Sequence, residues 1–64
     1  MDETKVRKWI HDLNNRLGIV LANAELMQME NLSPKARERT KTMEAKSLEI
    51  RQLIRELTEH LLAS

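Results

Sequence analysis

The apolar residues of this chain return at alternating steps of four and three, a pattern that predicts two long amphipathic helices. The first apolar seam consists of Val6, Ile10, Leu13, Leu17, Val20, Ala24 and Met27. The second is weaker in its first half and consists of Ala36, Thr40, Met43, Ser47, Ile50, Ile54, Leu57 and Leu61. Steps that average 3.5 residues are typical of left-handed coiled coils and four-helix bundles. We therefore expect an all-α fold.

One break separates the two seams, and its residues are those of a helix end followed by a helix start. Asn31 tolerates the left-handed backbone conformation that ends many helices. Ser33 is pushed toward an extended conformation by Pro34 and can cap the next helix, while Pro34 suits a first helical position. Such a short connection makes the two helices antiparallel neighbours in a hairpin.

At the start of the chain, Asp2 or Thr4 can cap the first helix. The chain is thus expected to form one domain over residues 1–64, with a helix over about 3–30, a turn over 31–33 and a helix over about 34–62. The end of the second helix is much more apolar than its start. We therefore expect the free end of the hairpin to be the better packed and the turn end to be looser.

A chain of 64 residues buries too little apolar surface to be comfortably stable alone. A lone hairpin would also leave several apolar residues beside the seams partly in water. These are Ile19, Leu21, Leu48, Leu53 and Leu62. Pairing two hairpins about a two-fold axis would cover them. We therefore predict a homodimer in which two hairpins form an antiparallel four-helix bundle.

The charges narrow the classes of partner. The 11 basic and 10 acidic side chains are interspersed and give a net charge of +1, which disfavours nucleic acid and anionic membranes as partners. The absence of cysteine fits a reducing, cytoplasmic setting, and no apolar run approaches the about 18 residues of a membrane span. His60 lies four residues after Glu56, but two ligands are too few for a zinc site. We expect no metal or cofactor bound by this chain.

The most informative stretch runs from Trp9 to Gly18. Here His11, Asn14, Asn15 and Gly18 share one face beside the apolar seam, following the spacing of three and four residues. Asparagine and glycine are poor helix formers, so their cluster costs a helix about 2 kcal/mol. The rest of the chain is rich in residues that favour helix, so this cluster is a local exception. Such exceptions often mark functional sites.

The segment His11-Asp12-Leu13-Asn14-Asn15, followed by Asn23-Ala24-Glu25-Leu26, resembles the H-box region of the dimerisation and histidine-phosphotransfer domain of sensor histidine kinases. Residues 54–64 are similar to the helix end that precedes the ATP-binding domain in that family. The resemblance covers most of the chain. It implies that His11 is phosphorylated from ATP and passes the phosphoryl group to an aspartate of a response regulator in two-component signal transduction.

The resemblance also implies roles for two neighbours of His11 and names the partners. Asp12 would bind one imidazole nitrogen and fix the tautomer, while Asn15 would orient water for dephosphorylation of the regulator. Spacing alone does not bring Asp12 to His11, because adjacent side chains on a helix do not naturally meet. The implied partners are an ATP-binding kinase domain, which would carry ATP and Mg, and a receiver domain.

Two features depart from the family pattern. Arg16 stands where many members have a proline that bends the helix, so this helix can stay straight or flex at Gly18 instead. Gly18 is the only glycine, so the chain lacks a phosphate-cradling loop and is expected to be a kinase fragment that is inactive alone with ATP. Two alternatives stay open: a structural helical-hairpin dimerisation module without phosphotransfer, and a stand-alone histidine phosphotransfer protein.

Overall fold

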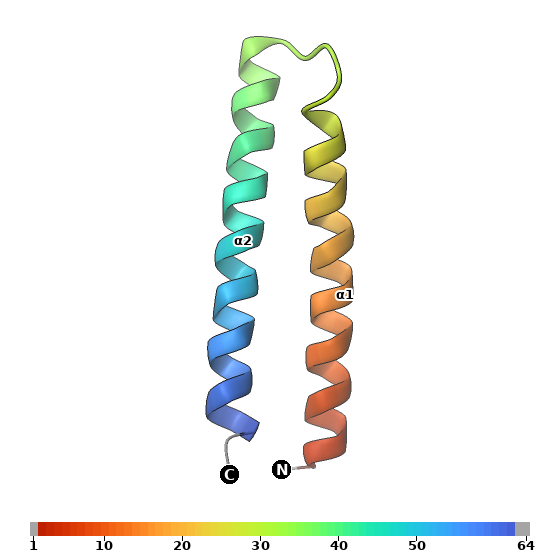
Figure 1. The fold of residues 1–64 in the computed structure, drawn as a ribbon, viewed down its shortest axis with the longest axis vertical. Coiled ribbons are helices and arrows are strands. Elements are labelled where there is room, and N and C mark those ends of the chain that lie inside the picture. Colours follow the sequence, from red (N-terminus) through yellow and green to blue (C-terminus); the bar gives the residue numbers. More distant parts are fainter. Residues whose placement is uncertain (1, 63–64) are drawn as a thin grey trace.

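The computed structural model describes residues 2–62, which form an antiparallel hairpin of two helices. Helix α1 spans Glu3–Met27 and helix α2 spans Pro34–Leu62. They pack side by side, and both free ends lie at the same end of the molecule (Figure 1). The hairpin is 47 Å long and 15 Å wide. The predicted all-α hairpin is thereby confirmed, and neither helix has the length and apolar content needed to cross a bilayer.

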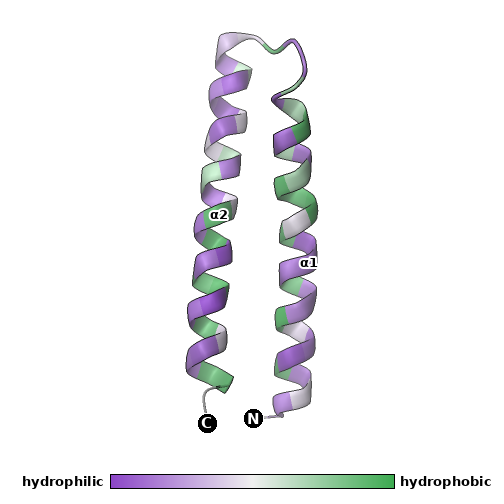
Figure 2. Cartoon of the chain, in the orientation of Figure 1, coloured by the Kyte–Doolittle hydropathy of each residue, from purple (hydrophilic) through white to green (hydrophobic). Residues whose placement is uncertain are grey.

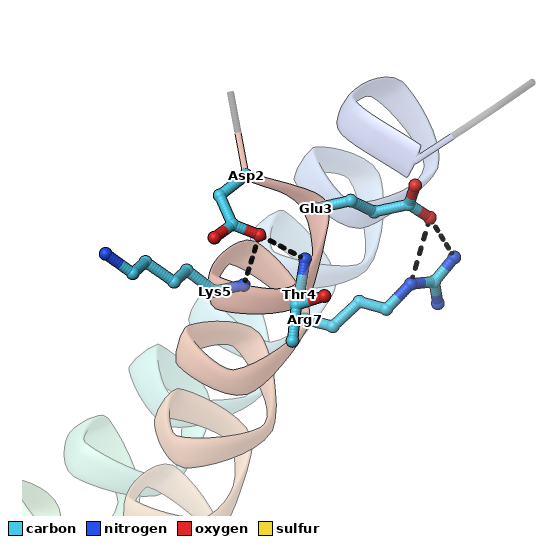
Figure 3. A network of polar contacts seen from close by, with 5 residues as sticks. All are labelled: Asp2, Glu3, Thr4, Lys5 and Arg7. Carbon is cyan, nitrogen blue, oxygen red and sulfur yellow. Dashed lines mark hydrogen bonds and ion pairs between the residues drawn. The ribbon is translucent and has the colours of Figure 1, made fainter.

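The first turn of α1 is fixed by Asp2. Its carboxylate accepts hydrogen bonds from the backbone N–H groups of Thr4 at 3.0 Å and Lys5 at 3.4 Å (Figure 3). These two donors have no carbonyl partner within the helix, so the aspartate satisfies them. One turn further, the guanidinium of Arg7 donates to the carboxylate of Glu3 at 2.7 Å. Of the two candidates that the sequence offered, Asp2 and Thr4, Asp2 is the cap.

Helix α1 ends at Met27, three residues before the expected end near Glu30. The chain tightens there, because the N–H groups of Gln28, Met29 and Glu30 each donate to the carbonyl three residues earlier. Among residues 2–62 no residue other than glycine has a positive φ, so the expected left-handed conformation at Asn31 is absent.

The guanidinium of Arg37 completes the connection by donating to the carbonyls of Gln28 at 3.2 Å and Glu30 at 3.3 Å. An arginine of the second helix thus satisfies carbonyls at the end of the first, as a glycine-type cap would otherwise do. Ser33 caps α2 as expected, since its hydroxyl accepts from the N–H of Ala36 at 3.2 Å. Pro34 occupies the first helical position.

The contact between the helices is narrow and largely polar on the α2 side. The buried residues are Val6, Leu17, Leu21 and Ala24 on α1, and Thr40, Ser47 and Ile54 on α2. The hydroxyl of Thr40 is satisfied by donating to the carbonyl of Ala36 at 2.8 Å. Leu21, which we expected to stay partly in water, is 6% exposed and belongs to this contact.

The expected seams are divided between two directions. Seven of the fifteen seam residues leave 36–49% of their surface exposed, and the other eight are buried or half-buried. The exposed seven are Leu13, Val20, Met27, Met43, Ile50, Leu57 and Leu61. Figure 2 shows apolar colouring along α1 and, on α2, mostly in the half nearer the free end. The chain exposes 5278 Å², whereas a compact protein of 7.5 kDa exposes about 4,200 Å².

The turn half of the hairpin holds more of the buried contact than the free half, which reverses the expectation. Five residues are buried in that half: Leu17, Leu21 and Ala24 of α1, and Thr40 and Ser47 of α2. At the free end, Val6 and Ile54 are the only buried residues among those the structure describes. The strongly apolar end of α2 does not improve this contact, because most of its large residues point away from α1.

Candidate functional site

His11 lies on α1 with 82% of its side chain exposed. Leu13, two residues further along, is on a different side of the helix, about 160° away at 3.6 residues per turn. His11 therefore lies on the side of the hairpin opposite the exposed members of the apolar seam. An imidazole in this position is open to a ligand or to a second protein.

Asp12 lies between His11 and Lys8. Its Oδ1 atom is 3.6 Å from Nδ1 of His11, and its Oδ2 atom accepts a hydrogen bond from Nζ of Lys8 at 2.9 Å. A separation of 3.6 Å is longer than a hydrogen bond, so the carboxylate acts on the imidazole through its charge. Adjacent positions on the helix thus bring the two groups close without joining them.

The hydrogen bond from Lys8 lowers the pKa of the Asp12 carboxyl below its ordinary value, and the positive charges of Lys8 and Arg16 act in the same direction. The carboxyl is therefore ionised at neutral pH. A negative charge beside Nδ1 of His11 favours the tautomer that carries its proton on that nitrogen. The other ring nitrogen, Nε2, then holds the free lone pair.

Asn15 and Gly18 extend the surface around His11. Asn15 follows His11 by one helical turn and is exposed. A Cβ atom added at Gly18 would meet no atom within 4 Å. Helix α1 continues through Arg16 and Gly18 without a break, so the arginine in the proline position leaves the helix intact. The surface beside His11 is polar and bare.

Asn14 lies on the same side but is turned toward α2, where a groove of about 430 Å³ runs between the helices. Its lining residues are Ile10, Asn14, Arg51, Arg55, Thr58 and Glu59. The sequence interpretation missed the two arginines. A signal was present, because Arg51 follows the seam residue Ser47 by four residues and precedes Ile54 by three, which places a cation directly beside the apolar seam.

Other charged candidates are engaged elsewhere. Arg7, four residues before His11, pairs with Glu3. Among residues 2–62 no group of three histidine, cysteine, aspartate or glutamate side chains is placed to hold a metal ion. His60 is exposed near the end of α2. It therefore serves as an internal reference, an exposed helical histidine without the neighbours of His11.

No protein-family model matches this chain, and neither does any curated protein or solved structure. The chemistry of the site therefore has to be read from its geometry. That geometry consists of an exposed imidazole, a carboxylate beside Nδ1, a bare polar surface and a nearby groove with two arginines. An imidazole arranged in this way can act as a nucleophile through Nε2.

Proposed function

We propose that this chain is a dimerising phosphoacceptor domain in which His11 receives a phosphoryl group and passes it to a carboxylate of a receiver domain. The observation that carries the proposal is the 82% exposure of His11 together with the Asp12 carboxylate 3.6 Å from Nδ1. A phosphoacceptor must be reached by a donor and later by an acceptor, so exposure is required. The nearby carboxylate makes one nitrogen the nucleophile.

The proposed function consists of two phosphoryl transfers. In the first transfer, Nε2 of His11 attacks the terminal phosphorus of ATP held by a separate kinase domain, and the bond from that phosphorus to the bridging oxygen breaks to release ADP. The ring then carries a proton on Nδ1 and the phosphoryl group on Nε2, a cation that the Asp12 carboxylate stabilises. In the second, a carboxylate oxygen of the receiver domain attacks the phosphorus, and the N–P bond breaks to restore neutral His11.

Asn15 is proposed to act after these transfers. It lies one turn beyond His11 on the same exposed side, and an amide offers both a donor and an acceptor to a water molecule. A receiver domain docked over His11 would bring its phosphorylated carboxylate near this amide. Asn15 would then orient the water that removes the phosphoryl group from the receiver.

The dimer is proposed from the exposed apolar side. This side combines seam residues of both helices that the hairpin leaves uncovered: Leu13, Val20, Met27, Met43, Ile50 and Leu57. A second copy offers a matching surface, because a two-fold axis brings the same side of each hairpin together. The result would be a four-helix bundle with His11 on the outside. A structural dimerisation module without phosphotransfer would have the same apolar side, so chemistry at His11 has to separate the two.

The deciding experiment treats the chain with phosphoramidate, a small donor that phosphorylates imidazoles without an enzyme. The products are followed by ³¹P NMR and mass spectrometry, with His60 as the internal reference. We expect His11 to react at Nε2 several times faster than His60. The fast phosphorylation should be lost in His11→Gln and kept in His60→Gln. In Asp12→Asn, the rate of phosphorylation at His11 should fall close to the rate at His60. Equal rates at both histidines in the unaltered chain would overturn the phosphoacceptor function and favour the structural module.

A further inference from the structure

We propose that the groove between α1 and α2 beside Asn14 binds the phosphate groups of a small phosphorylated ligand through Arg51 and Arg55. The site is distinct from His11 itself, and nothing in the phosphoacceptor chemistry requires it. Binding of phosphate there can be measured without any transfer. Only its use, to hold the phosphoryl donor or its product next to His11, rests on the proposed function.

The two arginines are available to a ligand. Within residues 2–62 neither makes an ion pair, in contrast to Arg7, which is held by Glu3 at 2.7 Å. Arg51 is half-buried directly beside the apolar seam, and Arg55 is exposed one turn later. A guanidinium is a planar fork that binds phosphate oxygens in pairs, so two of them on one helix face favour a phosphate ligand.

The other lining residues set the charge and the donors of the groove. Two guanidinium groups and the Glu59 carboxylate leave a net charge of +1. The hydroxyl of Thr58 already donates to the carbonyl of Ile54 at 2.7 Å, so it cannot donate to an anion. The amide of Asn14 remains as a neutral donor on the opposite wall. Phosphate would thus be held between the arginines of α2 and the amide of α1.

The position of the groove places it on the same side as His11. Asn14 follows His11 by three residues, which puts the two side chains about 60° apart on α1. On α2, Arg55 is about 140° around the helix from Ile50, a residue of the exposed apolar side. The groove therefore stays open when the apolar side is covered. Its volume of about 430 Å³ suits a small molecule better than a protein surface.

The test titrates the full chain with pyrophosphate and follows the backbone amides by ¹⁵N NMR. We expect saturable shifts at residues 10, 14, 51, 55 and 58, and at least tenfold weaker binding in Arg51→Gln/Arg55→Gln because charge-assisted hydrogen bonds are lost. Lys5→Gln/Lys41→Gln removes the same charge from exposed positions outside the groove and should bind as the unaltered chain does. Glu59→Gln removes the one negative charge of the groove and should tighten binding.

Three further arms complete the experiment. Unchanged binding in His11→Gln shows that the groove works without the phosphoacceptor, so that a failure of either proposal can be told from a failure of the other. ADP that binds more tightly than pyrophosphate assigns the groove to a nucleotide, and equal affinities assign it to the phosphates alone. Three results would overturn the proposal. They are the same shifts with adenosine, normal binding of pyrophosphate by Arg51→Gln/Arg55→Gln, and an absence of saturable shifts in the unaltered chain. The dispersion of the amide spectrum reports whether each variant is folded.

Discussion

The two broad sides of this hairpin differ in what they leave uncovered. One side carries apolar residues from both helices, with Ile50 46% and Leu13 49% exposed. The other carries His11, Asn15 and the bare backbone of Gly18. Both sides are open to solvent in the single chain, but contact with water is unfavourable only for the apolar side. Exposure therefore has a different consequence on each side: the apolar side requires a partner surface that excludes water, whereas the polar side can stay accessible to a reacting group.

The largest expected effect comes from placing a charge on the apolar side. Ile50→Glu should weaken the dimer by about 4 kcal/mol, or about a thousandfold in the dissociation constant, because a carboxylate would be buried without a partner. Leu48→Glu is the matched control. Leu48 is 47% exposed, almost the same as Ile50 at 46%, but it lies about 160° away on α2. The dimer proposed here therefore leaves Leu48 uncovered, contrary to the expectation from the sequence, and Leu48→Glu should leave the dimer intact.

Sedimentation equilibrium measures this difference directly. The unaltered chain should have twice the mass of 7.5 kDa, and Ile50→Glu should shift toward the monomer. A folded monomer of the unaltered chain at micromolar concentration would remove the proposed dimer. Equal weakening by both substitutions would show that the apolar side does not form the interface.

A smaller effect is expected on the opposite side. Gly18→Ala should raise the free energy of unfolding by about 0.5–1 kcal/mol, because alanine favours helix more than glycine and the added Cβ meets no atom within 4 Å. Ala22→Gly, one turn further on the same side, should lower it by a similar amount. Urea unfolding at a fixed protein concentration measures both changes. A loss of stability in Gly18→Ala would mean that another chain packs against this side.

The smallest expected effect is the contribution of the Asp12 charge to the stability of the fold, which depends on pH. The hydrogen bond from Lys8 lowers the pKa of Asp12 in the folded chain. The ionised carboxylate therefore stabilises the fold at pH values above the pKa that Asp12 has in the unfolded chain. That stabilisation should be lost as the pH falls through the lowered pKa, below the ordinary value of 3.8. Thermal unfolding should show a higher midpoint for the unaltered chain than for Asp12→Asn at neutral pH, with a gap that closes in acid.

Lys8→Met provides the control for this pair. Alone it should remove the same stabilisation, and combined with Asp12→Asn it should add little more, because both changes break one interaction. A gap between the unaltered chain and Asp12→Asn that does not change with pH would contradict the assignment.

The parts of the fold that depend on residues close together in the sequence were predictable from it. The cap at Asp2, the start of α2 at Ser33 and Pro34, and the hairpin layout all follow from local chemistry. The end of α1 was not, because Arg37 replaces the expected left-handed residue by reaching back from the other helix. In the site, the exposure of His11 follows from helical periodicity, but its distance to Asp12 depends on side-chain rotamers that spacing does not fix.

Local sequence patterns are enough to predict two helices, the place where they join and the residues on the apolar stripe of each. How each stripe is divided between buried and exposed residues depends on the packing of the two helices. A stripe wider than one seam allows several rotations of a helix, and packing against the second helix selects one of them. That choice buried Leu21 and left Leu13 and Ile50 outside. The same choice brought Asn14 and Arg51 to opposite walls of one groove, because residues far apart in the chain meet only when both helices have fixed their faces.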